Sequence, residues 1–459
     1  MGKASKNWVI DEIKAVDLGD KRLNQRCLEL LETLGGNPNE SIPKACSGWA
    51  ETVAAYRFFD NELVTQEKIL KPHKEATIER IKGEKVVLLC QDTTDINYNG
   101  RDKIEGMGVL SEEYQQGFYL HPMLAITSER LCLGVVDSQI WTRKKLRRRR
   151  KKDIKERESY RWIKGYKVAN EIAKNTPETM IVTVGDRESD MYELFCEGMK
   201  EGSQAHWLVR ANHNREIVKG CDKTKKKLKE ELMELPVLSE IEFRLSASKN
   251  RKGRKIRQEV RFGKVKFKPP VRKENLGEVE INVVYCREIG ENQGKEPIEW
   301  ILLTDVPIMN EERAIEIVQW YLCRWQIEIY FKVLKSGCLV EKLQFQDAGR
   351  IKACLGLYMI IAWRVLYVTM LGRAYPDASC EAIFEEAEWK VAYAVVKKKQ
   401  PPDNPPSLKD MIRMVGRLGG HLGRKSDGEP GVQAIWRGMQ RVQDMAIGWK
   451  RAMRGERCV

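Results

Sequence analysis

Two short apolar runs, each ending at an aspartate, constrain the fold of this chain more than any other feature. Residues 85–91 (KVVLLCQ) lead to Asp92, and residues 180–185 (MIVTVG) lead to Asp186. Runs of this length and character are typical of buried strands. The carboxyl ends of such strands gather at one edge of an α/β sheet, where ligands and catalytic groups usually lie. Taken singly, each aspartate also fits a plainer role as a turn or helix N-cap residue.

The segments between and after these runs predict an α/β protein with an antiparallel insertion. A hairpin is expected from residues 118–127 and 131–140, a helix over 160–175 and a strand over 206–209. Residues 221–307 alternate apolar and polar side chains, which is typical of antiparallel sheet with one face in water. The α/β unit is therefore expected to be interrupted by this second kind of sheet.

Helices are expected at both ends of the chain. The first seventy residues are expected to be helical, with one helix stopped by residues 35–38 (GGNP) and another over 49–59. A long helix is expected over 311–334. Residues 344–459 are also expected to be mostly helical, apart from a proline-rich loop at 400–407.

The charge of the chain predicts a polyanionic partner. The chain has 459 residues, long enough for about two or three domains, and a formal net charge of +15. Nine of the ten residues at 143–152 are basic, and further basic clusters lie at 223–230 and 249–268. A solvated loop or a localisation patch explains a single run of this kind. Three runs together favour nucleic acid, because each neutralised phosphate releases condensed counterions.

Several classes of protein are disfavoured by composition. The twelve cysteines are scattered without a C-x-x-C pair, which argues against a zinc site and against a disulfide framework. Free thiols in apolar segments suit a reducing compartment. No run is expected to reach the ~20 apolar residues of a membrane span, and no signal peptide is recognisable. We therefore expect a cytoplasmic protein without a membrane partner or a small-molecule cofactor.

A polar stripe is expected on the helix over 311–334. Tyr321, Arg324, Glu328 and Lys335 are spaced 0, 3, 7 and 14 along the sequence. At about 100° per residue, they fall within roughly 60° of one another on one helix face. Because the rest of the helix is apolar, this stripe is expected to face a site or a partner. The alternative is an Arg324–Glu328 pair on a solvated face, and the spacing alone leaves both open.

These motifs resemble those of DDE transposases of insertion-sequence-4 type, most closely the kind found in transposon five. The strings that carry the resemblance are residues 92–94 (DTT), residues 185–190 (GDRESD) and the Tyr-x(2)-Arg-x(3)-Glu-x(6)-Lys signature at 321–335. Further similar strings are residues 18–20 (LGD), 55–58 (AYRF), 299–304 (EWILLT), 418–420 (LGG) and 436–438 (WRG). Two departures are Ser189, where the family usually has Ala, and the unusually basic residues 143–152.

The resemblance implies a fold and a domain order. The implied fold is α/β, with an RNase H-like mixed-sheet catalytic core that carries an inserted antiparallel β domain. Helical domains are expected on both sides of the core. The implied boundaries are 1–72 for recognition of transposon ends, 73–365 for the catalytic domain with its insertion at about 215–308, and 366–459 for dimerisation.

The resemblance also implies a catalytic triad. Asp92, Asp186 and Glu328 would bind two Mg²⁺ ions, which Mn²⁺ can replace. The residue types suit this chemistry, because carboxylate oxygens are the ligands that these hard cations prefer. Two such ions can activate water and stabilise the leaving oxygen of a phosphoryl displacement.

Ten further residues are expected to contact DNA. They are Tyr321, Arg324 and Lys335 on phosphate beside the metals, Trp300 and Trp325 against a flipped base, Arg210 and His213 on the backbone, and Lys21, Arg22 and Arg26 on the transposon end. For Trp300 the residues alone favour a plainer role in the core of a strand. Stacking on an aromatic ring would help to offset the cost of unstacking a base.

The implied function is cut-and-paste DNA transposition by a homodimer in a synaptic complex. One strand is hydrolysed at each transposon end, the freed 3′-OH forms a hairpin, and the reopened end is transferred into target DNA. The implied location is the bacterial nucleoid. Alternatives are a catalytically silent transposition inhibitor and a general RNase H-like nuclease. A structural nucleoid protein would explain the charge but not the three carboxylates.

Overall fold

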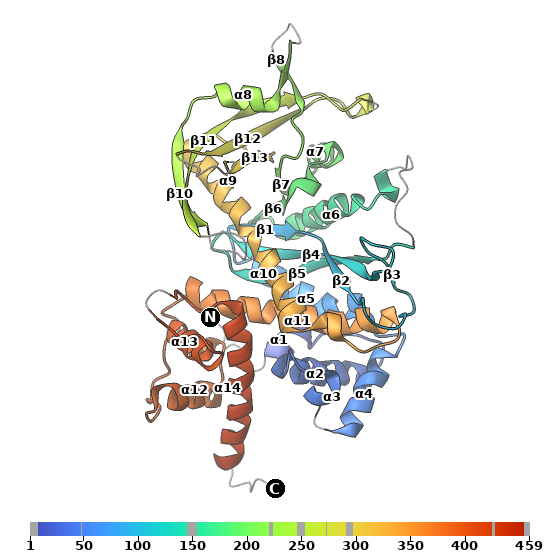
Figure 1. Cartoon of the computed structure of the whole chain (residues 1–459), viewed down its shortest axis with the longest axis vertical. Coiled ribbons are helices and arrows are strands. Elements are labelled where there is room, and N and C mark those ends of the chain that lie inside the picture. The colour runs from blue at the N-terminus through green and yellow to red at the C-terminus, as the bar shows by residue number, and fades with distance from the viewer. Residues whose placement is uncertain are drawn as a thin grey trace. The chain divides into compact units, whose positions relative to one another are not determined.

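The computed structural model of the chain (Figure 1) contains two compact units. It describes residues 8–46, 48–144, 154–219, 224–245, 253–271, 273–290, 297–424 and 427–453. Unit 1 takes its described residues from 1–81, 93–149 and 326–459, and unit 2 takes its from 82–92 and 150–325.

Unit 2 is built on three parallel strands in the order β1, β6, β7. Their bounds are β1 (Val86–Gln91), β6 (Met180–Gly185) and β7 (His206–Arg210). Cys90 lies opposite Val184, and Val184 lies opposite Leu208. Apart from their first residues, β1 and β6 are buried, as the two apolar runs predicted. The helices α6 (Tyr160–Asn175) and α7 (Tyr192–Gly198) follow β5 and β6 in the chain, and α6 packs on β6.

An antiparallel sheet extends unit 2 beyond β7, as the alternating pattern predicted. Strand β13 pairs antiparallel with β7, and β12 and β11 continue the sheet, with β10 and β8 on β11 and β9 on β8. The bounds are β8 (Glu216–Lys219), β9 (Thr224–Lys227), β10 (Ser239–Leu245), β11 (Arg254–Phe267), β12 (Val279–Glu288) and β13 (Glu299–Thr304). The helices are α8 (Leu228–Glu234) and α9 (Glu311–Cys323).

Unit 1 contains the predicted hairpin, β4 and β5, with β2 paired to the other side of β4 and β3 paired to the start of β4 on the side opposite to β2. The bounds are β2 (Thr94–Asn97), β3 (Gly108–Val109), β4 (Gln116–Thr127) and β5 (Cys132–Trp141). The helices α5 (Gln66–Ile81) and α11 (Ala348–Ala374) both pack on β5. The sequence pattern did not indicate α5, which has Pro72 in its interior.

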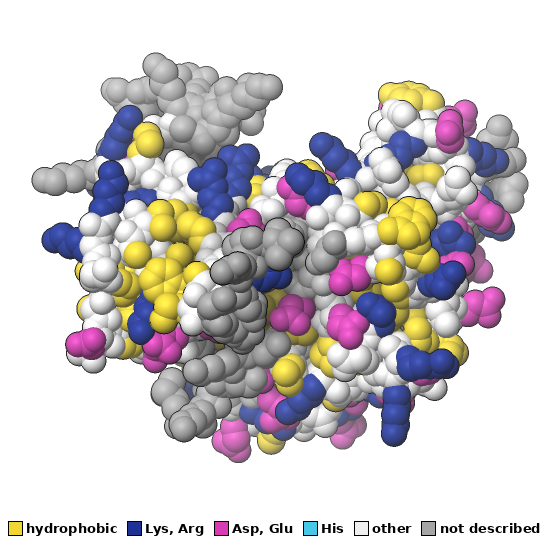
Figure 2. All heavy atoms as spheres, turned by 90° about the horizontal axis from the view of Figure 1, so that it is seen from below, with side chains coloured by type: hydrophobic (Ala, Val, Ile, Leu, Met, Phe, Trp, Pro, Cys, Tyr) yellow, Lys and Arg dark blue, Asp and Glu magenta, His cyan; other side chains and the backbone are white. Residues whose placement is uncertain are grey.

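Helices form the two ends of the chain within unit 1, as predicted. At the N-terminal side these are α1 (Trp8–Ile13), α2 (Lys21–Gly36), α3 (Ile42–Ala45) and α4 (Trp49–Phe59). At the C-terminal side they are α12 (Glu386–Lys397), α13 (Leu408–Leu418) and α14 (Val432–Met453). Figure 2, seen from below relative to Figure 1, shows Lys and Arg side chains interspersed with Asp and Glu between apolar patches.

Helix α11 corrects the expectation that no run approaches a membrane span. Its 27 residues, with a mean hydropathy of 1.8 in the most apolar window, are long and apolar enough to cross a membrane. However, 94% of that window is buried inside the protein. Helix α11 is therefore the central helix of unit 1, and no other described helix meets these criteria.

The single helix expected over 311–334 is wrong in detail, because the helix is broken at Arg324. Helix α9 ends at Cys323, and the Arg324 N–H bonds to the Tyr321 carbonyl, three residues back instead of four. Helix α10 (Trp325–Lys332) follows, and it continues into a π-helical turn over Val333–Gly337. The assumed 100° per residue therefore does not hold from Tyr321 to Lys335.

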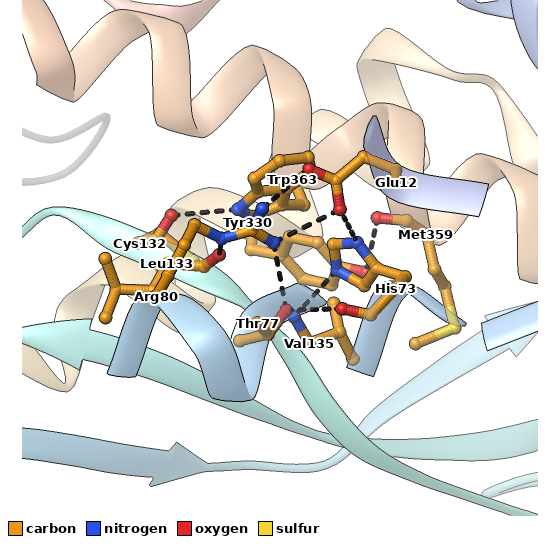
Figure 3. Close-up of polar contacts among 10 residues, drawn as sticks. All are labelled: Glu12, His73, Thr77, Arg80, Cys132, Leu133, Val135, Tyr330, Met359 and Trp363. Carbon is orange, nitrogen blue, oxygen red and sulfur yellow. Dashed lines mark hydrogen bonds and ion pairs between the residues drawn. The ribbon is translucent and has the colours of Figure 1, made fainter. Parts of the chain in front are cut away.

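A buried polar network holds α1 against α5 and β5 in unit 1 (Figure 3). The Glu12 carboxylate lies 2.6 Å from Nδ1 of His73 and 2.7 Å from Nη1 of Arg80. The Val135 N–H donates to Nε2 of His73 at 3.0 Å. The network thus connects one N-terminal helix to the hairpin through charged and polar groups.

The same network continues to α11, and a separate hydrogen bond beside it joins α10 to α11 (Figure 3). The Arg80 guanidinium lies 4.7 Å from the ring centroid of Trp363, whose indole N–H donates to the Cys132 carbonyl at 2.8 Å. The Tyr330 hydroxyl donates to the Met359 carbonyl at 3.1 Å. Since Tyr330 is fully buried in α10, this bond fixes one face of α10 against α11.

The ten described cysteines are all free thiols, and all but Cys196 are buried. This agrees with their interpretation as small apolar residues. Cys221 and Cys458 lie outside the described residues.

Candidate active site

The two strand-end aspartates lie at the same edge of the unit 2 sheet. Asp92 directly follows β1 and Asp186 directly follows β6. Because Cys90 is opposite Val184 in parallel strands, each aspartate lies two residues beyond the last paired position. Both side chains are partly exposed, with 20% of the Asp92 side chain accessible. The arrangement gives two neighbouring carboxylates that can reach a ligand in solvent.

The turn after β6 is tightly built around Asp186. The Asp186 carboxylate accepts the Glu188 N–H at 2.9 Å, and the Ser189 hydroxyl donates to the Asp186 carbonyl at 2.6 Å. A Cβ at Gly185 would lie 2.3 Å from Oγ of Ser189, so only glycine fits there. Ser189, which departs from the family's usual Ala, therefore supplies a hydrogen bond that holds the turn.

Asp190, the last aspartate of residues 185–190, holds a loop in place. Asp190 is buried and accepts hydrogen bonds from the backbone N–H groups of Asn212 and His213 and from the side chain of Arg215. These bonds fix the loop after β7. The His213 side chain itself is exposed.

Cationic and aromatic side chains surround Asp92 within unit 2. Nη1 of Arg324 lies 2.8 Å from the Asp92 carboxylate, and its guanidinium lies 5.8 Å from the ring centroid of the buried Tyr321. Arg210 donates to the Glu299 carbonyl at 2.9 Å. Burial lowers the pKa of Arg210 below its ordinary value, although the neighbouring Tyr321 opposes this. Three of the predicted residues thus gather beside one predicted carboxylate.

Trp300 lies in β13 and extends this group. Its ring stacks on Phe243 at 5.5 Å between centroids and meets Tyr321 edge-on at 6.0 Å. Trp300 is half-buried, whereas Trp325 at the start of α10 is 58% exposed. Phe243 was missed by the sequence analysis, and its only signal was an aromatic position in the alternating run of β10.

Glu328 and Lys335 belong to unit 1. Glu328 is half-buried in α10, one helical turn after Arg324 in the sequence. Lys335 lies in the π-helical turn, with Nζ 3.0 Å from the Asp95 carboxylate and 3.5 Å from that of Glu341. Neither acidic partner of Lys335 was predicted.

The predicted N-terminal residues all lie on α2. Lys21 is exposed, and the Arg22 side chain is 92% exposed although it pairs with Asp20 at 3.0 Å. Arg26 pairs with Glu29 at 2.9 Å. Such surface pairs contribute little to stability, so these cations can exchange partners.

Acidic residues neutralise part of the predicted basic clusters. Lys264 lies 3.0 Å from Glu280, and Lys266 lies 2.7 Å from Glu278. In the second cluster Lys226 pairs with Glu231. In the first run only residues 143–144 are described, and residues 145–152 lie outside the described residues, as do 223 and 249–252 of the other clusters.

The chemistry of the two aspartates fits a hard divalent cation. Both offer carboxylate oxygens, the donors preferred by Mg²⁺ and Mn²⁺. Among the described residues of unit 2, no third His, Cys, Asp or Glu completes a metal-binding group with them.

Comparisons with known protein families identify the class of this chain. The family model for "Transposase DNA-binding" matches residues 5–64, that for "Transposase DDE domain" matches 129–363, and that for "Transposase Tn5 dimerisation domain" matches 360–455. The second match alone covers more than half of the 459 residues. The chain therefore belongs to the DDE transposases, in the Tn5-like group.

Membership establishes the general properties of the protein. Its mixed α/β core is RNase H-like, and it is a DNA transposase of the DNA-cleaving and strand-transferring class. It depends on divalent metal, binds DNA and forms dimers.

Among solved structures, the chain is similar to a piggyBac transposase in a synaptic complex with hairpin DNA. The match covers 81% of this chain and 74% of that chain, with a TM-score of 0.37 and 9% sequence identity.

Proposed function

We propose that this protein is a cut-and-paste transposase in which Asp92, Asp186 and Glu328 are the catalytic and metal-binding residues. The observation that carries the proposal is the position of Asp92 and Asp186 at the ends of neighbouring parallel strands. Arg324, which contacts Asp92, precedes Glu328 by one helical turn in the sequence. The three carboxylates would hold two Mg²⁺ ions, which activate water and stabilise the leaving oxygen when bound.

The other residues of this site would bind and orient DNA. Arg324 and Tyr321 would donate hydrogen bonds to phosphate oxygens, and Arg210 would add positive charge. Lys335 would contribute a further cation. Trp300 and Trp325 would stack on a base that leaves the duplex. His213 would touch the DNA backbone from the loop after β7.

The proposed reaction proceeds in four phosphoryl transfers at each transposon end. Water first attacks a phosphate, and the broken bond leaves a free 3′-OH. That hydroxyl attacks the opposite strand to give a hairpin, which releases the flanking DNA. Water reopens the hairpin, and the restored 3′-OH then attacks a phosphate of target DNA. No protein nucleophile is required, because oxygen nucleophiles come from water and DNA alone.

The synaptic complex is proposed to be a homodimer that holds two transposon ends. Lys21, Arg22 and Arg26 on α2 would contact the end sequence from a domain at 1–72. Residues 73–365 would form the catalytic domain, with its insertion at about 215–308, and 366–459 the dimerisation domain. The matches at 5–64, 129–363 and 360–455 support this order. We further propose that the protein acts in the bacterial cytoplasm, on the nucleoid.

Two alternatives explain less of the chain. A silent transposition inhibitor would be expected to lack a catalytic carboxylate or the N-terminal region, and this chain has both. A general nuclease of the same fold would not need matched DNA-binding and dimerisation regions.

Cleavage of a labelled duplex that carries the element's own terminal repeat tests the proposal. The wild-type protein should nick the end and form a hairpin only with Mg²⁺ or Mn²⁺, and Glu328→Gln should do neither. Glu316→Gln, which alters a surface pair with Arg313 on α9, is the matched control and should cleave normally. End binding without cleavage by the wild type would favour the inhibitor. Cleavage of duplexes without the repeat would favour the nuclease.

A further inference from the structure

A groove in unit 1 carries positive charge that none of the roles above uses. Two cavities, of about 570 and 330 Å³, share Lys332, Gln433 and Arg437 in their walls. Since three residues line both cavities, the two adjoin one another between α10, α11 and the start of α14. Together we call them the α10–α14 groove.

The charge in this groove is of one sign. Lys332, Arg373 and Arg437 line it, and no described residue of its walls is Asp or Glu. All three cations are exposed. Within the described part of the chain, Lys332 and Arg437 form no ion pair. Their charge is therefore available to a partner.

The neutral residues of the groove suit the same partner. Asn39, Ser336 and Gln433 offer amide and hydroxyl groups beside the cations. Lysine and arginine with neutral hydrogen-bond donors are the side chains that most often contact the phosphates and sugars of DNA. These contacts fix the position of a duplex without reading its sequence.

Other cavities of unit 1 lack this character. The cavity beside α13 contains Asp410 and Glu429, and Glu429 pairs with Arg413. The cavity beside α4 contains Asp60, which pairs with Arg350. Acidic residues thus line both of these cavities. The described walls of the α10–α14 groove contain none, although Glu429 of the cavity beside α13 lies near Arg373.

We propose that the α10–α14 groove binds the phosphodiester backbone of double-stranded DNA, with Lys332, Arg373 and Arg437 contacting phosphates. Lys332 lies four residues after Glu328 on α10, so the two side chains share a helix face. DNA in the groove would therefore run next to the strand that reaches Glu328. That duplex is either the continuation of a transposon end or the target.

The test compares two double variants of the full-length protein with the same loss of charge. Lys332→Gln/Arg437→Gln removes the two cations that line both cavities. Lys398→Gln/Lys399→Gln, at exposed positions after α12, is the control. Binding of a labelled terminal-repeat duplex is measured over a range of salt concentrations. In the groove variant, the slope of log affinity against log salt concentration should be less negative by about 1.8, because two phosphate contacts are lost. The control should match the wild type.

A second labelled duplex, added to protein already bound to unlabelled ends, separates the two sources of DNA. A flatter slope with the end duplex assigns the groove to the transposon end. A flatter slope with the second duplex alone assigns it to the target. Unchanged slopes with both duplexes, in a variant with the wild-type melting temperature, would overturn the proposal. Binding of heparin, a polyanion that is not DNA, serves as a further comparison. A slope that changes only with heparin would also overturn the proposal. Because binding requires no cleavage, this result is independent of whether Glu328 is catalytic.

Discussion

The protonation state of His73 follows from its two hydrogen-bond partners. A backbone N–H can only donate, so Nε2 of His73, which accepts from Val135 at 3.0 Å, carries no proton. The proton is therefore on Nδ1, which donates to Glu12, and the ring is neutral. Burial lowers the pKa of His73 below its ordinary value, against the effect of Glu12. For Glu12, burial alone would raise the pKa, but His73 and Arg80 bring it below its ordinary value.

Acid is therefore expected to destabilise unit 1. Below the ordinary histidine pKa of about 6.5, His73 takes up a proton in the unfolded chain before it does so in the fold. The free energy of unfolding should then fall by up to about 1.4 kcal/mol per pH unit, and Glu12 adds a loss of the same sign at lower pH. Urea midpoints at pH 7, 6 and 5 measure this. His73→Gln should flatten the pH dependence, and His213→Gln, an exposed control, should not. Equal pH dependence in all three proteins would contradict the assignment.

Gly185 is expected to be essential for the turn that carries Asp186. In Gly185→Ala the new Cβ would lie 2.3 Å from Oγ of Ser189 and 3.0 Å from the ring of Trp162. We expect a loss of roughly 1–3 kcal/mol in stability. End cleavage should be abolished while end binding persists, measured on the same labelled duplex. Gly448→Ala, where a Cβ meets open space inside helix α14, should change neither cleavage nor binding and should not lower stability. Wild-type cleavage by Gly185→Ala would show that the turn is not required.

The position of a single residue could be predicted only where the neighbouring residues in the sequence determine it. Asp92 and Asp186 follow apolar runs, so their strand-end positions could be predicted from the neighbouring residues. Asp95 and Glu341 meet Lys335 only after the chain has folded, and Phe243 reaches Trp300 across the insertion. Such contacts cannot be derived from the spacing of residues along the chain.

At the scale of elements, the sequence could predict most strands and helices but not their interruptions. An apolar pattern over 311–334 is the same for a straight helix and for one that breaks, so the break at Arg324 was not visible. Helix α5 was missed because Pro72 weakens the helical signal, and tertiary contacts with α11 and β5 stabilise it. Cross-strand pairs of the insertion, such as Lys264–Glu280, could not be predicted from the charge clusters, because their partners lie on another strand.

The stack of Trp300 in β13 on Phe243 in β10 is expected to matter for one step of the reaction. Trp300→Ala should lower hairpin formation by about 5- to 150-fold, the equivalent of roughly 1–3 kcal/mol for one lost base stack. The first nick should remain close to the wild-type rate, because it needs no flipped base. Single-turnover assays that resolve nicked and hairpin products measure both steps. Phe243→Leu, which keeps apolar contact without a second ring, should give an intermediate loss. Equal losses in both steps would mean that Trp300 serves only the fold.

At the scale of the whole molecule, the sequence of one chain can predict its domains but not how two copies assemble. Length and charge were enough to predict several domains and a nucleic-acid partner. Dimerisation could not be derived from spacing or periodicity, because its contacts are made with a second copy. It was implied only by the resemblance, and the match at residues 360–455 now supports it independently. Helix α14 lies within that match and offers a place to test it.

Helix α14 leaves an apolar residue uncovered towards its C-terminal end. Val432, Ile435, Trp436 and Val442 are buried within the unit, whereas Ile447 remains 47% exposed. An exposed apolar residue in a dimerisation region is expected to be covered in the assembly. Ile447→Glu should therefore shift the complex with the terminal-repeat duplex from two protein chains to one.

The mass of the protein–DNA complex in analytical ultracentrifugation measures this shift. The melting temperature of the free protein should be unchanged, because an exposed Ile447 supports little of the unit's own core. Val271→Glu provides the matched control, since Val271 is 85% exposed but lies outside the dimerisation match, and its complex should keep the wild-type mass. If Ile447→Glu and the wild type form complexes of equal mass, the dimer contact does not include this part of α14. If both glutamate variants lose mass, added negative charge is repelling DNA, and Ile447 has no specific role in the dimer.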